Sequence, residues 1–109
     1  MSTIDQAADL LAKMSAAEKA EFLQLVAGDV LGVPLGIDSQ PGVCGGEPCI
    51  VRTRIPVWML EQARRLGASD SEVLRAYPTL RASDLVNAWA YVGQHREEID
   101  LQIRQNEEN

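Results

Sequence analysis

The sequence predicts a mainly α-helical fold centred on a trihelical helix-turn-helix unit, with a short β-hairpin beside it and an N-terminal helical hairpin before it. Apolar residues recur at spacings of three and four along most of the chain, which is typical of amphipathic helices. Turns at Gly67 and Pro78 divide the second half into three helical segments, of which the last is the longest. A chain of 109 residues is long enough for one domain with its own core.

The first 27 residues predict two consecutive helices. Ser15 begins a Ser-Ala-Ala-Glu capping box with Glu18, and the second helix is expected to stop near Gly28. Glycine and proline then interrupt residues 30–41, a connector with room for a short strand around Leu35–Ile37. The first helix carries its apolar residues on one face: Ile4, Ala7, Ala8, Leu11 and Met14.

A loop at residues 41–48 leads into two short β-branched runs, residues 49–51 and 55–57. The three polar residues between the runs predict a tight hairpin. Pro56 cannot donate to a ladder, so it is expected at an edge or at the mouth of the following helix.

The next helix is expected over residues 57–66, with Glu61 and Arg65 as an ion pair one turn apart. Another begins after Ser69, a good N-cap, and stops at Pro78. The last begins near Ala82, and because Arg96 interrupts its apolar stripe, we expect it to continue as an arm beyond Gln94. We therefore divide the chain into a helical hairpin and connector (1–36), a helix-turn-helix domain (37–96) and an acidic helical tail (97–109).

The formal net charge of −6 is spread unevenly along the chain. Residues 1–43 and residues 97–109 each carry −4, whereas residues 44–96 carry +2 and all their basic residues are arginines. One interpretation is a solvated surface; the other is a basic centre that meets an anion between two acidic ends.

Other classes of protein are disfavoured. Cys44 and Cys49 are expected to be thiols, because a C-x4-C spacing with the single His95 is a poor zinc site, and we predict no metal and no other cofactor. We find no convincing catalytic constellation, so we expect a binding protein rather than an enzyme. With no signal peptide and no apolar stretch of about 20 residues, we expect a cytoplasmic protein without a membrane contact.

The block from Pro41 to Val57, PGVCGGEPCIVRTRIPV, resembles the signature of domain-of-unknown-function family 433. Tyr77-Pro78-Thr79-Leu80 and the segment Asp84–Tyr91 supply the later parts of that family's pattern in the right order. The resemblance covers residues 37–93 and implies a winged or homeodomain-like helix-turn-helix fold. It also implies a likeness to VapB-type antitoxins, which bind PIN-like ribonuclease toxins and repress their own operons.

Three positions depart from the family pattern. Arg52 replaces a glycine, so the turn loses glycine's freedom at positive φ and we expect its shape to differ. Glu47 replaces a basic residue and lowers the positive charge of the loop. Arg81 replaces a Thr or Ser cap, which weakens the helix start but places a guanidinium where a recognition helix would meet DNA.

We predict five DNA-binding residues on the hairpin tip and the first turns of the last helix. The alternative for the hairpin arginines is a solvated turn, or, for Arg54, a structural tie between the hairpin and the glycine loop. Asp84 and the lack of further basic residues on the helix count against DNA reading. The five residues are Arg52, Arg54, Arg81, Ser83 and Asn87.

For the tail we predict a partner-binding face formed by Ile99, Ile103 and Arg104, against the alternative of a frayed helix end. The leading hypothesis is thus a homodimeric, DNA-binding, antitoxin-like protein that binds a PIN-like toxin. The alternative is a protein–protein interaction module with the same fold and no nucleic-acid binding. The aromatic residues Trp58, Tyr77, Trp89 and Tyr91 are expected to be core or interface anchors.

Overall fold

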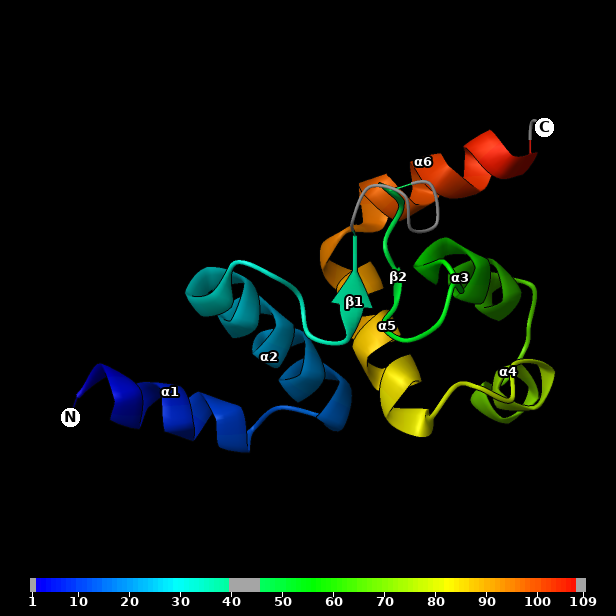
Figure 1. Ribbon diagram of the computed structural model, residues 1–109. Helices are drawn as coiled ribbons and strands as arrows, with labels where there is room; N and C mark the ends of the chain where they lie inside the picture. Colours follow the sequence, from blue (N-terminus) through cyan, green and yellow to red (C-terminus); the bar gives the residue numbers. More distant parts are fainter. Residues whose placement is uncertain (1, 40–45, 108–109) are drawn as a thin grey trace.

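The computed structural model describes residues 2–39 and 46–107 (Figure 1). The predicted fold class is confirmed: the described part of the chain is mainly helical, with six helices and one small antiparallel sheet. The elements are α1 (Thr3–Ala12), α2 (Ala16–Leu31), β1 (Ile37–Asp38), β2 (Cys49–Ile50), α3 (Val57–Arg65), α4 (Asp70–Ala76), α5 (Ala82–Gln94) and α6 (Arg96–Glu107).

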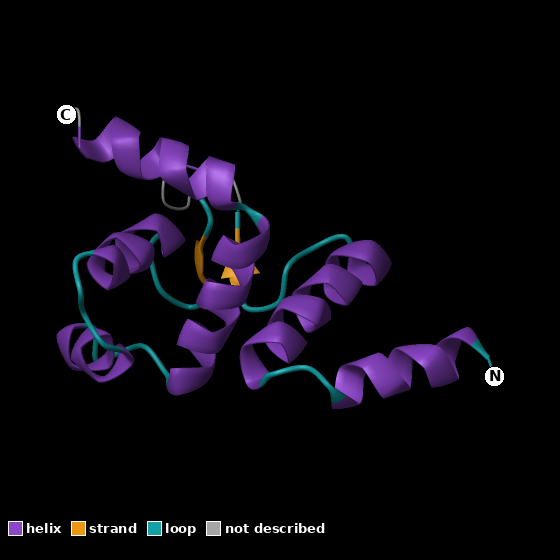
Figure 2. Ribbon diagram, turned by 180° about the vertical axis from the view of Figure 1, so that it is seen from behind, coloured by secondary structure: helices purple, strands orange, loops and turns teal. Residues whose placement is uncertain are grey.

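Helix α5 is the centre of the molecule. Helix α2 packs along one side of it, and α3 and α4 pack on another side (Figures 1 and 2). The buried apolar side chains form one continuous cluster, which includes Leu60 of α3, Val73 of α4, and Leu85 and Val92 of α5. The predicted aromatic anchors are confirmed, because Trp58, Tyr77 and Trp89 pack against this cluster and Tyr91 is part of it.

Local capping determines where the helices begin. The Ser15 hydroxyl oxygen accepts a hydrogen bond from the Glu18 N–H at 3.1 Å, and the Glu18 carboxylate accepts one from the Ser15 N–H at 2.9 Å, as predicted. Ser69 caps α4 in the same way. The predicted end of α2 at Gly28 is wrong, since the helix continues to Leu31. Gly32 takes the left-handed conformation (φ 76°) and its N–H bonds to the Gly28 carbonyl, so the C-cap lies one turn later than expected.

The N-terminal helices are both present, but α1 does not pack as one half of a tight hairpin. None of its residues is buried, and it diverges from α2 after the turn at Lys13–Ser15 (Figure 1). Helix α2, by contrast, buries Gln24 and Ala27. The Gln24 amide donates to the Leu35 carbonyl and accepts from the Leu35 N–H, both at 2.7 Å, which ties the connector to α2.

The strand pairing differs from the predicted hairpin. Strand β2 pairs with β1 from the connector, Ile37 opposite Ile50 and Asp38 opposite Cys49. Between the predicted runs only a single bridge, Cys49 to Pro56, is found in the described residues. Pro56 has no N–H to extend a ladder, and it is already the N-cap of α3, so no second strand can form.

The tail is a docked helix rather than an extension of α5. The chain breaks at His95 (φ −132°, ψ 40°), and α6 turns back to pack against α3. Ile99 and Ile103 enter the core, and Arg65 of α3 forms an ion pair with Asp100 of α6. None of the helices described is long and apolar enough to cross a bilayer.

Candidate functional site

Arg52 has a structural partner. Its Nη2 lies 3.3 Å from Oδ1 of Asp84, whose side chain is buried at the start of α5. Arg52 takes the left-handed conformation (φ 67°), which glycine adopts more readily than other residues, and the expected difference from the family's turn stays a prediction. A non-glycine residue pays about 1–2 kcal/mol for this conformation. The ion pair to a buried carboxylate offsets part of that cost.

Asp84 also repairs the helix start that Arg81 was expected to weaken. Its second oxygen, Oδ2, accepts the Arg81 N–H at 2.8 Å, which is the N3-to-N-cap half of a capping box. The Arg81 side chain has no acceptor oxygen and cannot supply the other half. Glu47, the third departure, accepts a hydrogen bond from the Trp58 indole at 3.2 Å. Asp84 and Glu47 therefore both make contacts that stabilise the fold.

The other predicted DNA-binding residues differ in exposure. Asn87 is half-buried and packs against Gly36: a Cβ added at that glycine would lie 2.5 Å from the Asn87 Nδ2. Arg54, Arg81 and Ser83 are exposed, and because Asp84 contacts both Arg52 and the Arg81 N–H, the turn at Arg52 lies next to the start of α5. The tie predicted between Arg54 and the Gly45-Gly46 loop falls partly outside the described residues, which include Gly46 but not Gly45.

Helix α2 covers the side of α5 that carries Asn87, Ala90 and Gly93. Ala90 is only 3% exposed and lies on the same side of α5 as Asn87 and Gly93. The Gln94 amide donates to the Glu21 carbonyl of α2, and the Gln24 amide lies 3.5 Å from the Asn87 carbonyl. The α5 surface left open is mainly its first turn and Val86, which is apolar and 51% exposed.

The arginines of α3 are also paired within the chain. Glu61, predicted to pair with Arg65, accepts from both Arg64 (2.6 Å) and Arg65 (2.9 Å), and its side chain is buried. The Arg65 guanidinium also donates from Nη2 to Asp100 of α6, and the hydrogen bonds to Asp100 and Glu61 raise the pKa of Arg65. The basic centre is therefore partly neutralised by these internal contacts.

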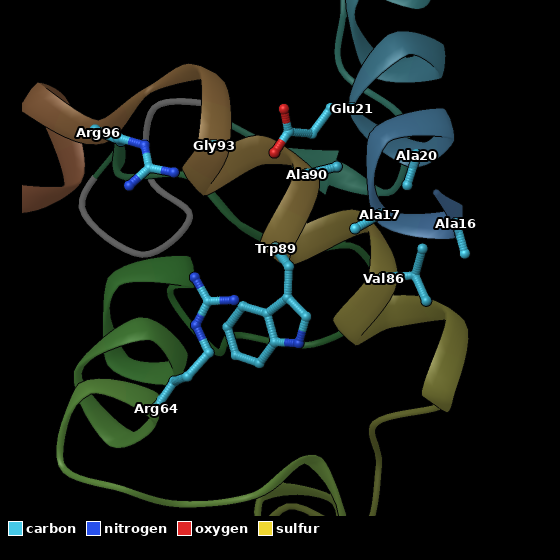
Figure 3. A pocket seen from close by; sticks show the side chains of 10 residues that line it. All are labelled: Ala16, Ala17, Ala20, Glu21, Arg64, Val86, Trp89, Ala90, Gly93 and Arg96. Atoms are coloured by element: carbon cyan, nitrogen blue, oxygen red, sulfur yellow. The ribbon is translucent and has the colours of Figure 1, made fainter. Parts of the chain in front are cut away.

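Where α2 leaves α5, an open cleft of about 310 Å³ forms between α2, α3 and α5 (Figure 3). Small side chains form much of its lining, since α2 contributes Ala16, Ala17 and Ala20, and α5 contributes Ala90 and Gly93. Glu21 crosses toward α5 in the space that a side chain at position 93 would need: a Cβ there would lie 2.4 Å from Glu21 Oε1. We call this site the α2–α5 cleft.

Trp89 is the large side chain of the α2–α5 cleft, and its position is fixed from two directions. The indole N–H donates to Asp70 of α4 at 3.1 Å, and the Arg64 guanidinium lies 4.2 Å from the ring centroid as a cation–π contact. Figure 3 shows Trp89 and Arg64 side by side, with Arg96 and Glu21 at the rim. Of the rim charges, Arg96 has no ion-pair partner among residues 2–39 and 46–107.

The sequence reasoning missed the α2–α5 cleft, although a signal was present. Alanines at positions 16, 17 and 20 and the Ala90/Gly93 pair are small residues at helical spacing on two helices. Such spacing allows close helix approach and also leaves hollows where the helices part. Which of the two occurs depends on how α2 crosses α5, and that is not encoded locally.

The predicted partner-binding residues are divided between the core and the surface. Ile99 is 0% exposed and Ile103 is 5% exposed, so a partner could reach them only if α6 left α3. Arg104 is exposed. Near the start of α6, Tyr91 donates to Glu98 at 2.9 Å and stacks on His95; burial, and then the bond to Glu98, raise the Tyr91 pKa.

Within the described parts of the chain, no group of three or more His, Cys, Asp and Glu side chains lies close enough to hold a metal ion. Cys49 is fully buried in β2, and Cys44 lies outside the described residues. The cleft, with its small residues, one indole wall and mixed rim charges, has the shape and lining of a site that could hold an apolar group.

The family described as "Protein of unknown function (DUF433)" matches residues 37–92, from β1 through α5. The chain belongs to this family. A solved DUF433 member, the 2.00 Å crystal structure from Anabaena variabilis ATCC 29413, is 38% identical, with a TM-score of 0.63. That similarity covers 95% of this chain and 99% of the other, so most of the N-terminal segment outside residues 37–92 has a counterpart in the relative. No curated protein matches the chain.

Proposed function

We propose that this DUF433 protein is an antitoxin-like protein-binding module that holds its partner at the α2–α5 cleft. The observation that carries the proposal is the position of α2. It covers the side of α5 that carries Asn87 and Ala90, and it leaves a cleft lined largely by small apolar residues along its own edge. The proposal assigns no catalytic step and no cofactor to the chain.

The α2–α5 cleft suits one large apolar side chain of a partner protein. Its small lining residues allow a close approach, and the fixed Trp89 ring offers a flat apolar wall that needs no reordering on binding. A central apolar anchor in such a pocket commonly carries much of the binding free energy of a protein interface. The unpaired Arg96 at the rim favours an acidic residue next to that anchor.

The first partner to test is a PIN-like ribonuclease, because of the family's likeness to VapB-type antitoxins. A reading frame for such a nuclease beside the gene would identify the candidate at low cost. Affinity purification of the full chain with its bound proteins, followed by mass spectrometry, would then show whether that nuclease is the protein recovered.

The site itself is tested by filling it. Ala17 is exposed and lines the cleft, so Ala17→Leu occupies space that the partner's anchor needs while the fold is preserved. We expect binding of the recovered nuclease, measured by isothermal titration calorimetry, to weaken by roughly tenfold or more. Ala76→Leu, at an exposed alanine at the end of α4, is the matched control and should bind like the unchanged chain. Equal affinity of the two variants would reject the cleft as the binding site.

A second candidate function is binding of operator DNA to repress the protein's own operon. It is favoured by Arg54, Arg75 and Arg81, which are exposed and have no ion-pair partner within the described residues. A gel shift against the upstream DNA tests it: binding should fall steeply with salt and should be lost in Arg54→Glu/Arg81→Glu. The absence of a shift even at low salt would remove this candidate and leave the protein-binding module.

A further inference from the structure

The exposed apolar surface of the protein is concentrated on its first two helices and the residues just after them. Of the thirteen exposed large apolar side chains in the described residues, ten lie between residues 4 and 33. Single exposed apolar residues are ordinary on a protein surface, but a contiguous group of this size marks an interaction site.

Helix α2 carries one of two apolar stripes in this region. Phe22, Leu23, Val26 and Val30 follow the spacing of one helical face, on the side of α2 away from Gln24 and Ala27, which pack toward α5. The four side chains are 38%, 54%, 39% and 73% exposed, in that order. The stripe therefore has no complete cover within a single chain.

Helix α1 carries the other stripe, and it has little to pack against. Its ten residues include none that is buried, and Ile4, at the start of the stripe, is 76% exposed. An isolated helix of this length is marginal in water, even with the capping box that Ser2 and Asp5 provide. A helix so placed gains most of its stability from whatever covers its apolar face.

We propose that two copies of this chain form a two-fold dimer in which α1 of each copy lies on the α2 stripe of the other. Each chain has two apolar stripes that nothing covers, one on α1 and one on α2. In a dimer with two-fold symmetry, the α1 stripe of each copy would cover the α2 stripe of the other, so that all four stripes are buried. Charge does not select this arrangement, because both segments carry Lys and acidic residues; the choice of a second copy rests on the two uncovered stripes. The charged residues are Asp5, Asp9 and Lys13 at α1, and Glu18, Lys19, Glu21 and Asp29 on α2.

The available area is sufficient for a stable dimer. Covering a half-exposed large apolar side chain buries on the order of 100 Å². The six large exposed side chains of the two stripes therefore supply on the order of 600 Å² per chain, which is the lower end of the roughly 600–1,000 Å² that each partner buries in a standard interface. These six are Ile4, Leu11, Phe22, Leu23, Val26 and Val30.

This dimer is independent of the α2–α5 cleft. The cleft uses the residues of α2 that face α5, such as Ala20 and Glu21, and the dimer uses the opposite side of the helix. A failure of nuclease binding in Ala17→Leu and a failure of self-association are therefore distinguishable results.

Sedimentation equilibrium of the full chain, over micromolar to millimolar concentrations, tests the dimer. The unchanged chain should reach twice the mass of one chain. Ile4→Glu on α1 and Val26→Glu on α2 should each weaken dimerisation by roughly 100-fold or more, because the symmetry removes each contact twice. Leu66→Glu, at a side chain that is 82% exposed in the turn after α3, is the control and should leave the dimer unchanged.

Each contrary outcome would overturn the proposal. A single-chain mass at all concentrations would mean that α1 folds back on its own α2 or that another protein covers this face. A dimer that Ile4→Glu leaves intact would exclude α1 from the interface, and one that Leu66→Glu weakens equally would lie elsewhere. Far-ultraviolet circular dichroism of the variants separates loss of association from loss of fold.

Discussion

Replacing Ile99 with alanine tests whether α6 belongs to the core or is held in reserve for a partner. The Ile99 side chain is 0% exposed and lies in the core cluster, so the substitution leaves a cavity beneath α6. An isoleucine-to-alanine change in a packed core costs about 2–5 kcal/mol. Since each kcal/mol shifts the melting temperature of a domain of this size by about 4–8 °C, we expect Tm to fall by roughly 10–20 °C.

The assay is thermal and urea unfolding followed by circular dichroism, with Leu101→Ala on the same helix as the matched control. Leu101 is 48% exposed, so Leu101→Ala should lower the free energy of unfolding much less than Ile99→Ala does. We expect the loss of the buried half of the leucine side chain and at most about 0.5 kcal/mol in addition. If both variants lower the free energy of unfolding by the same small amount, α6 is not docked on α3 in solution. Ile99 and Ile103 would then be accessible to a partner, as the sequence predicted.

Three further predictions concern single side chains. Arg52→Ala and Arg52→Gly both lose the ion pair to Asp84, but only the glycine variant also relieves the strain of the left-handed backbone. We expect Arg52→Gly to be more stable than Arg52→Ala by about 1 kcal/mol in urea unfolding. The opposite order would contradict the left-handed conformation of this residue. The hydrogen bonds from Ser69 hold the pKa of Glu72 below its ordinary value of 4.5, so the folded state favours the charged carboxylate. That stability is present above pH 4.5 and is lost as pH falls through the lowered pKa, so Glu72→Gln should destabilise at pH 7 and match the unchanged chain in strong acid; a difference independent of pH would refute this. Gly93→Ala should not lower the free energy of unfolding, because the added Cβ displaces only the flexible end of Glu21 while alanine raises the helix propensity by up to about 1 kcal/mol. A loss of more than about 1 kcal/mol in urea unfolding would show that Glu21 is held in place.

The elements predicted correctly are those with short-range signals. Ser15 and Ser69 indicate helix starts because each forms a capping box with the residue three positions later. Gly67 and Pro78 lie between α3 and α4 and between α4 and α5, as predicted. The apolar periodicity of α5 indicates one covered face, and Leu85 and Val92 on that face are buried. Periodicity, however, reports that a face is covered and not what covers it.

The features that were missed depend on contacts between distant residues. Gln24 and Asn87 are 63 positions apart, and their contact places α2 over α5. The same limit explains why the pairing of β2 with β1 was not predicted and why α6 was expected to leave the domain. The net charge of a segment shows an excess of arginine, but it does not show that Arg64 and Arg65 both form ion pairs with Glu61.

The position of α2 has a consequence for what counts as an autonomous unit in this family. The segment that defines DUF433 here, residues 37–92, contains α5 but not the helix that shields Ala90 and Asn87. Expressed alone, that segment would present a bare helical flank to solvent and would also lack Ile99 and Ile103 from its interior. The segment that matches the family thus forms the middle of a folding unit, which α2 and α6 close from either side in the sequence.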